Sequence, residues 1–226
     1  MGAIKWTVID ELEEALAMPR RRLMECELVQ RFLGGTLTEQ HYILFLWETW
    51  HFVRHTPRHL LMAAERMPAG PMRARFEHHA AEETGHDQWA LDDLAALGVC
   101  PVKVQASTPL PETLRLIAYQ RHTASALDPL ALLGLEYGME GFTANAGGAA
   151  MDGLTRSLGL PAEATRFLSR HAKLDVHHLD EDIAALERFV QTPAQRAAVI
   201  ANARSSMLLY AAVYDSICRV ADEMGV

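Results

Sequence analysis

The chain has 226 residues, half of them hydrophobic and 22% charged, an ordinary balance for one globular domain with a well-buried core. Its net charge of −8, without a block of basic residues, argues against nucleic acid or an anionic membrane as a partner. Cys26, Cys100 and Cys218 lack CxxC spacing, which excludes a finger-type zinc site and indicates a reducing compartment. The N-terminal segment lacks an apolar signal sequence, and no run of about 18 apolar residues occurs, so we expect a cytoplasmic protein.

Glycine, proline and capping residues divide the chain into about seven predicted helices. No strand is needed, because no period-two alternation bounded by turn residues is sustained. We therefore predict one all-α domain over residues 1–226, with a loop at 101–109. The predicted helices cover residues 7–33, 38–67, 72–97, 111–126, 128–158, a sixth segment that starts at 161, and 192–224.

The fifth predicted helix is rich in glycine, at positions 134, 138, 141, 147 and 148. Glycine disfavours a helix by about 1 kcal/mol relative to alanine. Their density in one helix therefore predicts a kink or a close approach to a neighbouring helix.

The sixth predicted helix contains the sequence His-Ala-Lys-Leu-Asp-Val-His-His. His171, Asp175 and His178 are spaced four and three apart, so they fall within an arc of about 60° on one helix face. Two imidazoles and a carboxylate form a ligand set for a divalent first-row metal, with iron as the first choice. Alone, this stripe is equally compatible with a solvated helix face.

Matching ligands occur on three other predicted helices. Glu83 and His86 form a Glu-x-x-His pair on the third, the pair type that di-iron bundles draw from two of their helices. Glu48 and Glu136 each stand in an apolar run, where a carboxylate is costly to bury unless it is paired or metal-bound. The sequence therefore predicts a metal site built from four helices.

The number of ligands points to two metal ions. Four carboxylates and three imidazoles exceed one octahedral shell, and four anionic ligands would neutralise two ferrous ions. Zinc hydrolysis needs fewer and softer ligands, so iron or manganese ranks above zinc. The predicted metal ligands are Glu48, Glu83, His86, Glu136, His171, Asp175 and His178.

This pattern resembles the heme-oxygenase-like di-iron oxidases and oxygenases, a family of iron-containing redox enzymes, over the whole chain. In that family a lone Glu precedes Glu-x-x-His, and a second lone Glu precedes His-x-x-x-Asp-x-x-His. Here Glu48 precedes Glu83 by 35 residues, and Glu136 precedes His171 by 35 residues.

The resemblance implies a heme-oxygenase-like bundle that oxidises a small amino-acid-like or fatty-acid-like substrate through a peroxo-diferric intermediate. It implies two ferrous ions, with manganese as an alternative, O2 as co-substrate, and an external electron donor. It also implies that the iron held by Asp175, His171 or His178 binds loosely. A homodimer is favoured by general frequency alone.

Six further residues are expected beside the ligands or in a substrate pocket. Glu140 lies one turn after Glu136, and His79 one turn before Glu83, where it could hydrogen-bond a ligand. For each of the others, a core or surface position is the simpler interpretation. The full set is His79, Glu82, Glu140, His51, His55 and Tyr137.

Three other functions are compatible with an all-α chain of this kind. A ferritin-like di-iron oxidase or iron-handling protein uses the same ligand order, although His171 and the number of helices favour the heme-oxygenase-like fold. A cofactor-free enzyme of the thiaminase or pyrroloquinoline-quinone-synthase type has no need of seven ligands. A non-catalytic metal-binding helical protein would differ from the enzyme in not consuming O2.

Overall fold

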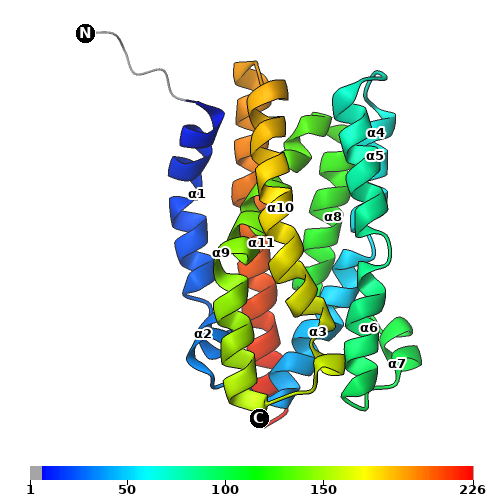
Figure 1. The fold of residues 1–226 in the computed structure, drawn as a ribbon, viewed down its shortest axis with the longest axis vertical. Helices are drawn as coiled ribbons and strands as arrows, with labels where there is room; N and C mark the ends of the chain where they lie inside the picture. Colours follow the sequence, from blue (N-terminus) through cyan, green and yellow to red (C-terminus); the bar gives the residue numbers. More distant parts are fainter. Residues whose placement is uncertain (1–6, 226) are drawn as a thin grey trace.

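The structure is a computed structural model that describes residues 7–225; residues 1–6 and 226, and with them most of the N-terminal segment considered above, lie outside the described residues. Residues 7–225 contain eleven α-helices, two short 3-10 helices and no strand, as predicted for an all-α protein. The long helices run along one axis and form an elongated bundle (Figure 1). None of the helices in this range is long and apolar enough to cross a membrane.

Several consecutive helices are separated by only one to three residues. The 3-10 helices span Pro129–Ala131 and Ala162–Ala164. The α-helices are α1 (Val8–Met24), α2 (Glu27–Gly34), α3 (Glu39–Val53), α4 (Thr56–Glu65), α5 (Pro71–Glu83), α6 (His86–Ala96), α7 (Pro101–Gln105), α8 (Pro111–Ala126), α9 (Leu132–Leu158), α10 (Arg166–Phe189) and α11 (Pro193–Glu223).

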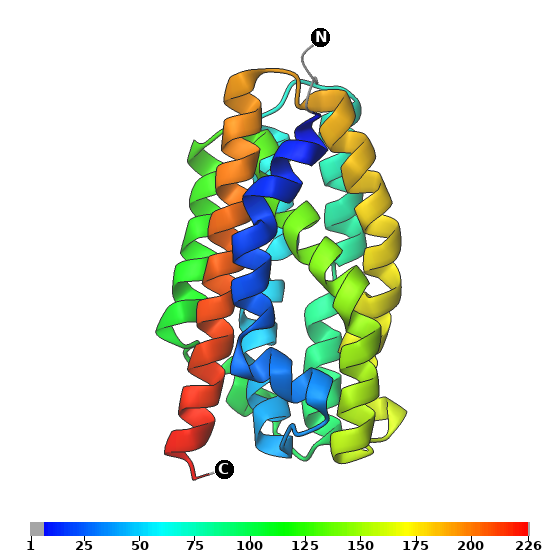
Figure 2. The same ribbon diagram turned by 90° about the vertical axis from the view of Figure 1, so that its left-hand side faces the viewer.

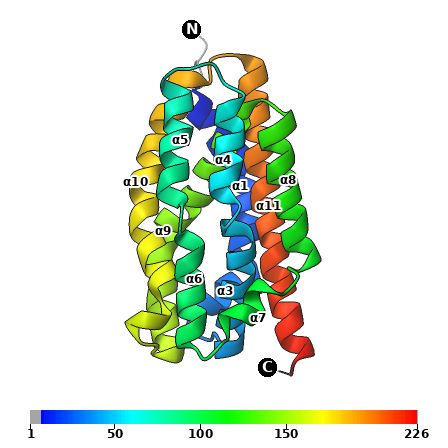
Figure 3. The same cartoon turned by 90° about the vertical axis from the view of Figure 1, so that its right-hand side faces the viewer.

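Each of the first three predicted helices is in fact two helices, separated by two residues. The interruptions lie at residues 25–26, 54–55 and 84–85, and the predicted loop at 101–109 contains the short helix α7. At the third interruption Thr84 is extended and Gly85 has a φ of 96°, in the left-handed region that favours glycine. Figure 3 shows the result, with α5 placed above α6 and the junction between them.

Helix α9 packs on its neighbours through bare backbone at two glycines, as the glycine content predicts. A Cβ added to Gly134 would lie 2.2 Å from the carbonyl oxygen of Val199 on α11. A Cβ added to Gly153 would lie 1.6 Å from the carbonyl oxygen of Phe32 on α2. Neither distance tolerates a side chain, so these glycines hold α9 against α11 and α2. Figure 2 shows α9 (light green) beside α10 (yellow).

Side-chain caps fix the starts of the helices that surround the bundle centre. Asp93 on α6 accepts hydrogen bonds from the backbone N–H groups of Arg166 (3.0 Å) and Phe167 (2.8 Å), the first residues of α10. This cap ties α10 to α6 and satisfies N–H groups that the helix itself cannot. Thr192 forms a capping box with Gln195 at the start of α11, where the sequence predicts a helix start.

Candidate metal centre

Six side chains from α5, α6, α9 and α10 form two groups of candidate metal ligands. Within each group the three donor atoms all lie within 4.8 Å of one another. Four of the six residues are buried, and Glu140 and His171 are half-buried. The first group, the His86 triad, is Glu83, His86 and His171; the second, the His79 triad, is His79, Glu140 and His178.

The His86 triad is assembled across the junction between α5 and α6. Glu83 is the last residue of α5 and His86 the first of α6, so the Glu-x-x-His pair does not lie on the continuous helix that the spacing predicts. The bend at Thr84 and Gly85 still brings the two side chains together, with His86 Nδ1 3.2 Å from Glu83 Oε1. The Glu-x-x-His pair therefore spans a break between two helices rather than one turn of a single helix.

His171 reaches the same point from α10 with its ring fixed. Its Nδ1 lies 3.0 Å from the carbonyl oxygen of Phe167, one turn earlier, and the Phe167 ring packs against the imidazole at 4.1 Å between centroids. A hydrogen bond from Nδ1 to a carbonyl leaves Nε2 with a free lone pair, the form that ligates a metal. Burial lowers the pKa of His171 to about 4, which keeps the imidazole neutral.

The His79 triad brings α5, α9 and α10 together. His79 Nε2 lies 3.5 Å from Glu140 Oε1, and His178 Nδ1 lies 4.0 Å from Glu140 Oε2. The outer nitrogen of His178, Nε2, lies 3.8 Å from Glu82, so Glu82 stands behind this imidazole. Burial, together with the charge of Asp182, raises the pKa of Glu140 well above its ordinary value.

Glu83 connects the two triads. Its Oε1 lies 3.2 Å from His86 Nδ1 and 3.8 Å from His79 Nε2. Asp175, also predicted as a ligand, belongs to neither triad but lies 4.0 Å from His178 Nδ1. Burial, and then the charge of Glu83, raises the pKa of Asp175 to about 8. Two carboxylates, Glu83 and Asp175, therefore lie close to the imidazoles of the triads.

Glu136, which is predicted as a metal ligand, forms a salt bridge with a cationic side chain of the protein itself. Its Oε2 lies 2.6 Å from Arg75 Nη1 and 3.4 Å from His79 Nδ1. Burial favours the protonated acid, but the Arg75 charge and His79 outweigh burial and lower the pKa of Glu136 to about 2. Glu140, one turn later, occupies the triad in its place.

Glu48 is also predicted as a ligand, but the structure places it outside both triads. Its Oε2 accepts hydrogen bonds from Thr113 Oγ1 and from the backbone N–H of Leu110 at 3.0 Å. On α3, the residues Phe45, Thr49, Phe52 and Val53 line a cavity that lies beside the triads. Glu48 lies to one side of that face, toward α8, where the hydrogen bonds satisfy its buried carboxylate.

Of the six further residues expected beside the ligands, three lie near the triads and three lie elsewhere in the bundle. His51 Nε2 lies 2.8 Å from the hydroxyl of Ser107, and the ring of His55 stacks on His59 at 6.0 Å between centroids. Tyr137 donates a hydrogen bond to Glu13 on α1. These three contact other parts of the bundle, whereas His79, Glu82 and Glu140 surround the triads as described above.

The sequence analysis did not identify Arg75 and Asp182, which form a buried ion pair next to the His79 triad. Arg75 binds Glu136 through Nη1 and Asp182 through Nη2. A signal for both existed in the helical spacing. Arg75 precedes His79 by four residues and Asp182 follows His178 by four, so both continue a ligand stripe by one turn.

The donor set fits divalent first-row metal ions. His79 Nε2 and Glu140 Oε2 are buried and have no hydrogen-bond partner among the described residues, although buried polar groups are normally paired. Imidazole and carboxylate donors together suit iron or manganese. A cation at each triad would satisfy these atoms and offset the like charges that raise the pKa values of Asp175 and Glu140.

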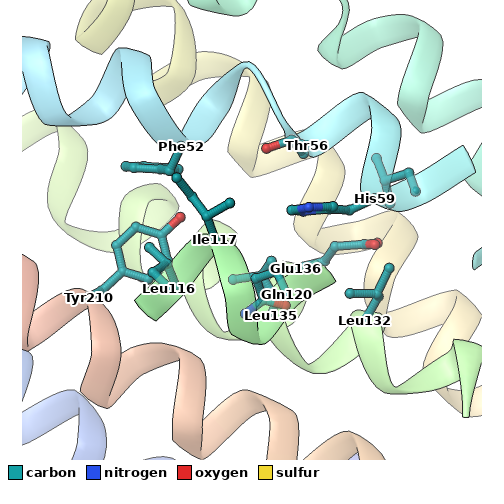
Figure 4. Close-up of a pocket in the computed structure, with 11 residues that line it drawn as sticks. Phe52, Thr56, His59, Leu116, Ile117, Gln120, Leu132, Leu135, Glu136 and Tyr210 are labelled. Carbon is teal, nitrogen blue, oxygen red and sulfur yellow. The ribbon is translucent and has the colours of Figure 1, made fainter. Parts of the chain in front are cut away.

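A cavity of about 150 Å³ lies beside both triads. Its walls come from α3, α9, α10 and α11, and Phe52, Met139 and Tyr210 contribute to them. A smaller cavity of about 40 Å³ adjoins it and shares Phe52, Thr56, Leu135, Glu136 and Tyr210. Figure 4 shows this smaller cavity, with Thr56, His59 and Glu136 around it. The two cavities form a mainly apolar space at the ligands.

A family model described as "Iron-containing redox enzyme" matches residues 43–211, which include all six residues of the two triads. A search of curated proteins finds no match.

Solved structures show the same fold. A domain of unknown function from Shewanella denitrificans, with a heme oxygenase-like fold, is 24% identical with a TM-score of 0.88, over 99% of this chain and 96% of that one. A TenA homologue from Pseudomonas syringae is 16% identical with a TM-score of 0.82, over 94% and 93%. Heme oxygenase from Leptospira interrogans is 14% identical with a TM-score of 0.72, over 93% and 100%.

Proposed function

The chain belongs to the family of iron-containing redox enzymes, and we propose that it is a non-heme di-iron oxidase or oxygenase that uses O2 to oxidise a small organic substrate. The observation that carries this proposal is the pair of triads joined by Glu83. One triad would suffice for a mononuclear site. Two adjacent triads, with Glu83 of one lying 3.8 Å from His79 of the other, offer ligands for a dinuclear centre.

Each triad would hold one ion through two imidazoles and a carboxylate. Asp175, 4.0 Å from His178, would add a further carboxylate beside the His79 triad. Counted as ionised, Glu83, Glu136, Glu140, Asp175 and Asp182 carry five negative charges against the one positive charge of Arg75. Two divalent cations would neutralise the difference, so the buried cluster supports two ions better than one.

Two ferrous ions held there would supply the electrons that reduce O2, and the chain would supply a shaped, mainly apolar space beside them. Phe45, Phe52 and Met139 on the cavity wall exclude water from the ligands. A cavity of about 150 Å³ is about the size that holds one benzene molecule. The volume therefore favours a small substrate, such as an amino acid or a short acyl chain, over a long-chain lipid.

The proposal is tested by loading the metal-free protein anaerobically with ferrous iron, counting the bound iron, and measuring O2 consumption and the Mössbauer spectrum after exposure to O2. We expect two irons per chain and oxidation to a coupled diferric form. Protein that binds no iron, or that binds it without reacting with O2 in the presence of any amino-acid or short-acyl candidate, would contradict the proposal.

The chain offers a matched pair of variants for this test. His178→Ala removes an imidazole of the His79 triad, whereas His177→Ala removes its exposed neighbour, which pairs with Glu181. We expect His178→Ala to lose iron and O2 consumption, and His177→Ala to retain both. Equal behaviour of the two variants would show that the triad does not hold the metal.

A further inference from the structure

A separate cavity of about 70 Å³ lies between α2, α9 and α10 and is almost entirely apolar. Val29, Phe32 and Ala150 belong to its wall, and Thr143 and Tyr214 contribute the polar groups. Apolar cavities of this kind stay empty of water and bind small apolar molecules such as xenon. The cavity is therefore a candidate site for a gas rather than for a polar substrate.

The apolar cavity adjoins the cavity at the metal ligands. The two share Phe45, Thr143, Leu168 and Tyr214 as common walls. Thr143 follows Glu140 by three residues on α9, so the face of α9 that presents a ligand to the His79 triad continues directly into the apolar cavity. These side chains therefore lie at the boundary between the apolar cavity and the cavity at the ligands.

On its other side the apolar cavity adjoins a groove of about 520 Å³ that is lined by α1, α2, α9 and α10. The groove and the apolar cavity share Leu33, Phe142 and Ala146. Figure 2 faces this side of the bundle, with α1 (blue) across the view and α9 and α10 beside it. Groove, apolar cavity and metal cavity therefore follow one another from the surface inward.

The occupant of this path is limited by its polarity. A charged or strongly polar substrate would lose its hydration in the apolar cavity without finding hydrogen-bond partners there. O2 is small, uncharged and apolar, and loses little on entry. We propose that the apolar cavity is the path by which O2 reaches the metal centre, while the organic substrate occupies the cavity beside α3 and α4. This inference rests on the proposed di-iron function.

Two alanines on α9 provide a matched pair of variants. Ala146 is half-buried and lines both the groove and the apolar cavity, so Ala146→Phe places a ring in the connection between them. Ala149 is exposed and lines the groove without reaching the apolar cavity, so Ala149→Phe adds the same ring outside the path. Neither residue is a metal ligand.

The first measurement uses xenon on crystals of the metal-free protein, and so needs no activity. We expect a xenon atom in the apolar cavity of the wild type and of Ala149→Phe, and none in Ala146→Phe. Absence of xenon from this cavity in the wild type would overturn the proposal.

The second measurement uses nitric oxide, a diatomic gas that binds ferrous iron directly and gives a visible absorbance band. In stopped-flow mixing with the ferrous protein, we expect Ala146→Phe to slow the second-order binding step about tenfold or more, and Ala149→Phe to leave it within about twofold, at unchanged iron content. Equal rates for both variants would overturn the path and leave the di-iron proposal intact. Wild-type protein that binds no iron, or iron that binds no nitric oxide, would contradict the di-iron proposal itself.

Discussion

Arg75 Nη1 lies 2.6 Å from Oε2 of Glu136, and the other terminal nitrogen of the same guanidinium binds Asp182. All three side chains are buried or nearly so, with 13%, 5% and 0% of their surfaces exposed. Burial opposes a charged guanidinium, but the two carboxylates outweigh it and raise the pKa of Arg75. The protein thus provides its own cation for Glu136, which leaves Glu140 as the carboxylate of the His79 triad.

Removal of this guanidinium should destabilise the metal-free protein strongly. Arg75→Met leaves Glu136 and Asp182 buried without a cation, and breaking a buried ion pair from one side costs about 3–5 kcal/mol. We expect a loss of this size in the free energy of unfolding measured with urea. Part of it should return when Mn²⁺ is added, because a metal ion offsets the same charges.

The control for Arg75 is Arg73→Met. Arg73 is on the same helix, but its partner Glu77 and its own side chain are well exposed. Exposed pairs contribute about 0–1 kcal/mol, so this variant should unfold nearly like the wild type. Similar losses for both variants would mean that the buried network contributes no more than a surface pair.

The second prediction separates the carboxylates of the triads from those outside them. Glu140→Ala removes a donor from the His79 triad and should reduce bound iron from two ions per chain to one, measured by metal analysis after anaerobic loading. Glu48→Gln keeps a hydrogen-bond acceptor for Thr113 and Leu110, so it should bind two ions like the wild type. Loss of iron in Glu48→Gln would restore Glu48 as a ligand.

The third prediction concerns pH. Burial lowers the pKa of His79, but its hydrogen bond to Glu136 and the charge of Glu136 outweigh burial and raise it to about 9. The pKa of Asp175 is raised to about 8, chiefly by burial. Near neutral pH the metal-free protein therefore holds protons on both groups that a metal ion must displace.

The sign of this effect is the same for both groups. Each pKa is higher in the folded than in the unfolded chain, so each contribution to stability is lost as the pH rises through the folded value. Metal-free protein should lose stability between about pH 6 and 9, while the stabilisation by Mn²⁺ grows over the same range. Thermal unfolding with and without Mn²⁺ measures both trends, and a metal-induced shift in Tm that shrinks with rising pH would refute the assignment.

The fourth prediction tests the junction inside the Glu83–His86 pair. Gly85 has a φ of 96°, and alanine is disfavoured in the left-handed region by about 1–2 kcal/mol, so Gly85→Ala should destabilise the protein by that amount. It should also weaken iron binding, because it shifts His86 relative to Glu83. Gly148 lies inside α9 with open space at its Cβ position, so Gly148→Ala should instead stabilise the protein by up to about 1 kcal/mol.

The fifth prediction concerns the thiols. Burial raises the pKa of Cys26 to about 11 and that of Cys218 to about 12, whereas Cys100 is exposed. Because the thiolate is the reactive form, one thiol per folded chain should react quickly with Ellman's reagent, and all three should react in denaturant. Cys100→Ser should abolish the fast reaction, and fast reaction in that variant would mean that a buried thiol is accessible.

Helix boundaries marked by local chemistry could be predicted from the sequence. Thr192 and Asp128 cap helices where expected, and Gly159 ends α9 in the left-handed conformation with a φ of 56°. Pro57, the second residue of α4, marks the interruption at residues 54–55, because a helix usually ends at or before the residue that precedes a proline; the prediction of one helix over residues 38–67 overlooked this signal. At Gly85 a glycine was present, but the spacing of Glu83 and His86 favoured a continuous helix.

The candidate metal ligands, like the helix boundaries, could be predicted only in part from the sequence. The structure places Glu83, His86, His171 and His178 in the triads and Asp175 beside them. Glu83 and His86 meet across a break between two helices, not along one helix as their spacing predicts. The choice between Glu136 and Glu140 could not be made from sequence, because the two lie one turn apart on one face of α9. It depends on Arg75, which comes from another helix, and such tertiary contacts leave no trace in local spacing.

The two backbone contacts of α9 determine which parts of the centre can adjust to a metal. Gly134 against α11 and Gly153 against α2 fix the helix on either side of Glu140, so α9 can neither slide nor turn without a clash. These contacts therefore fix the backbone position of Glu140. A change in spacing between free and loaded protein would therefore come from α5 and the two-residue link before His86, or from α10, which carries His171, Asp175 and His178.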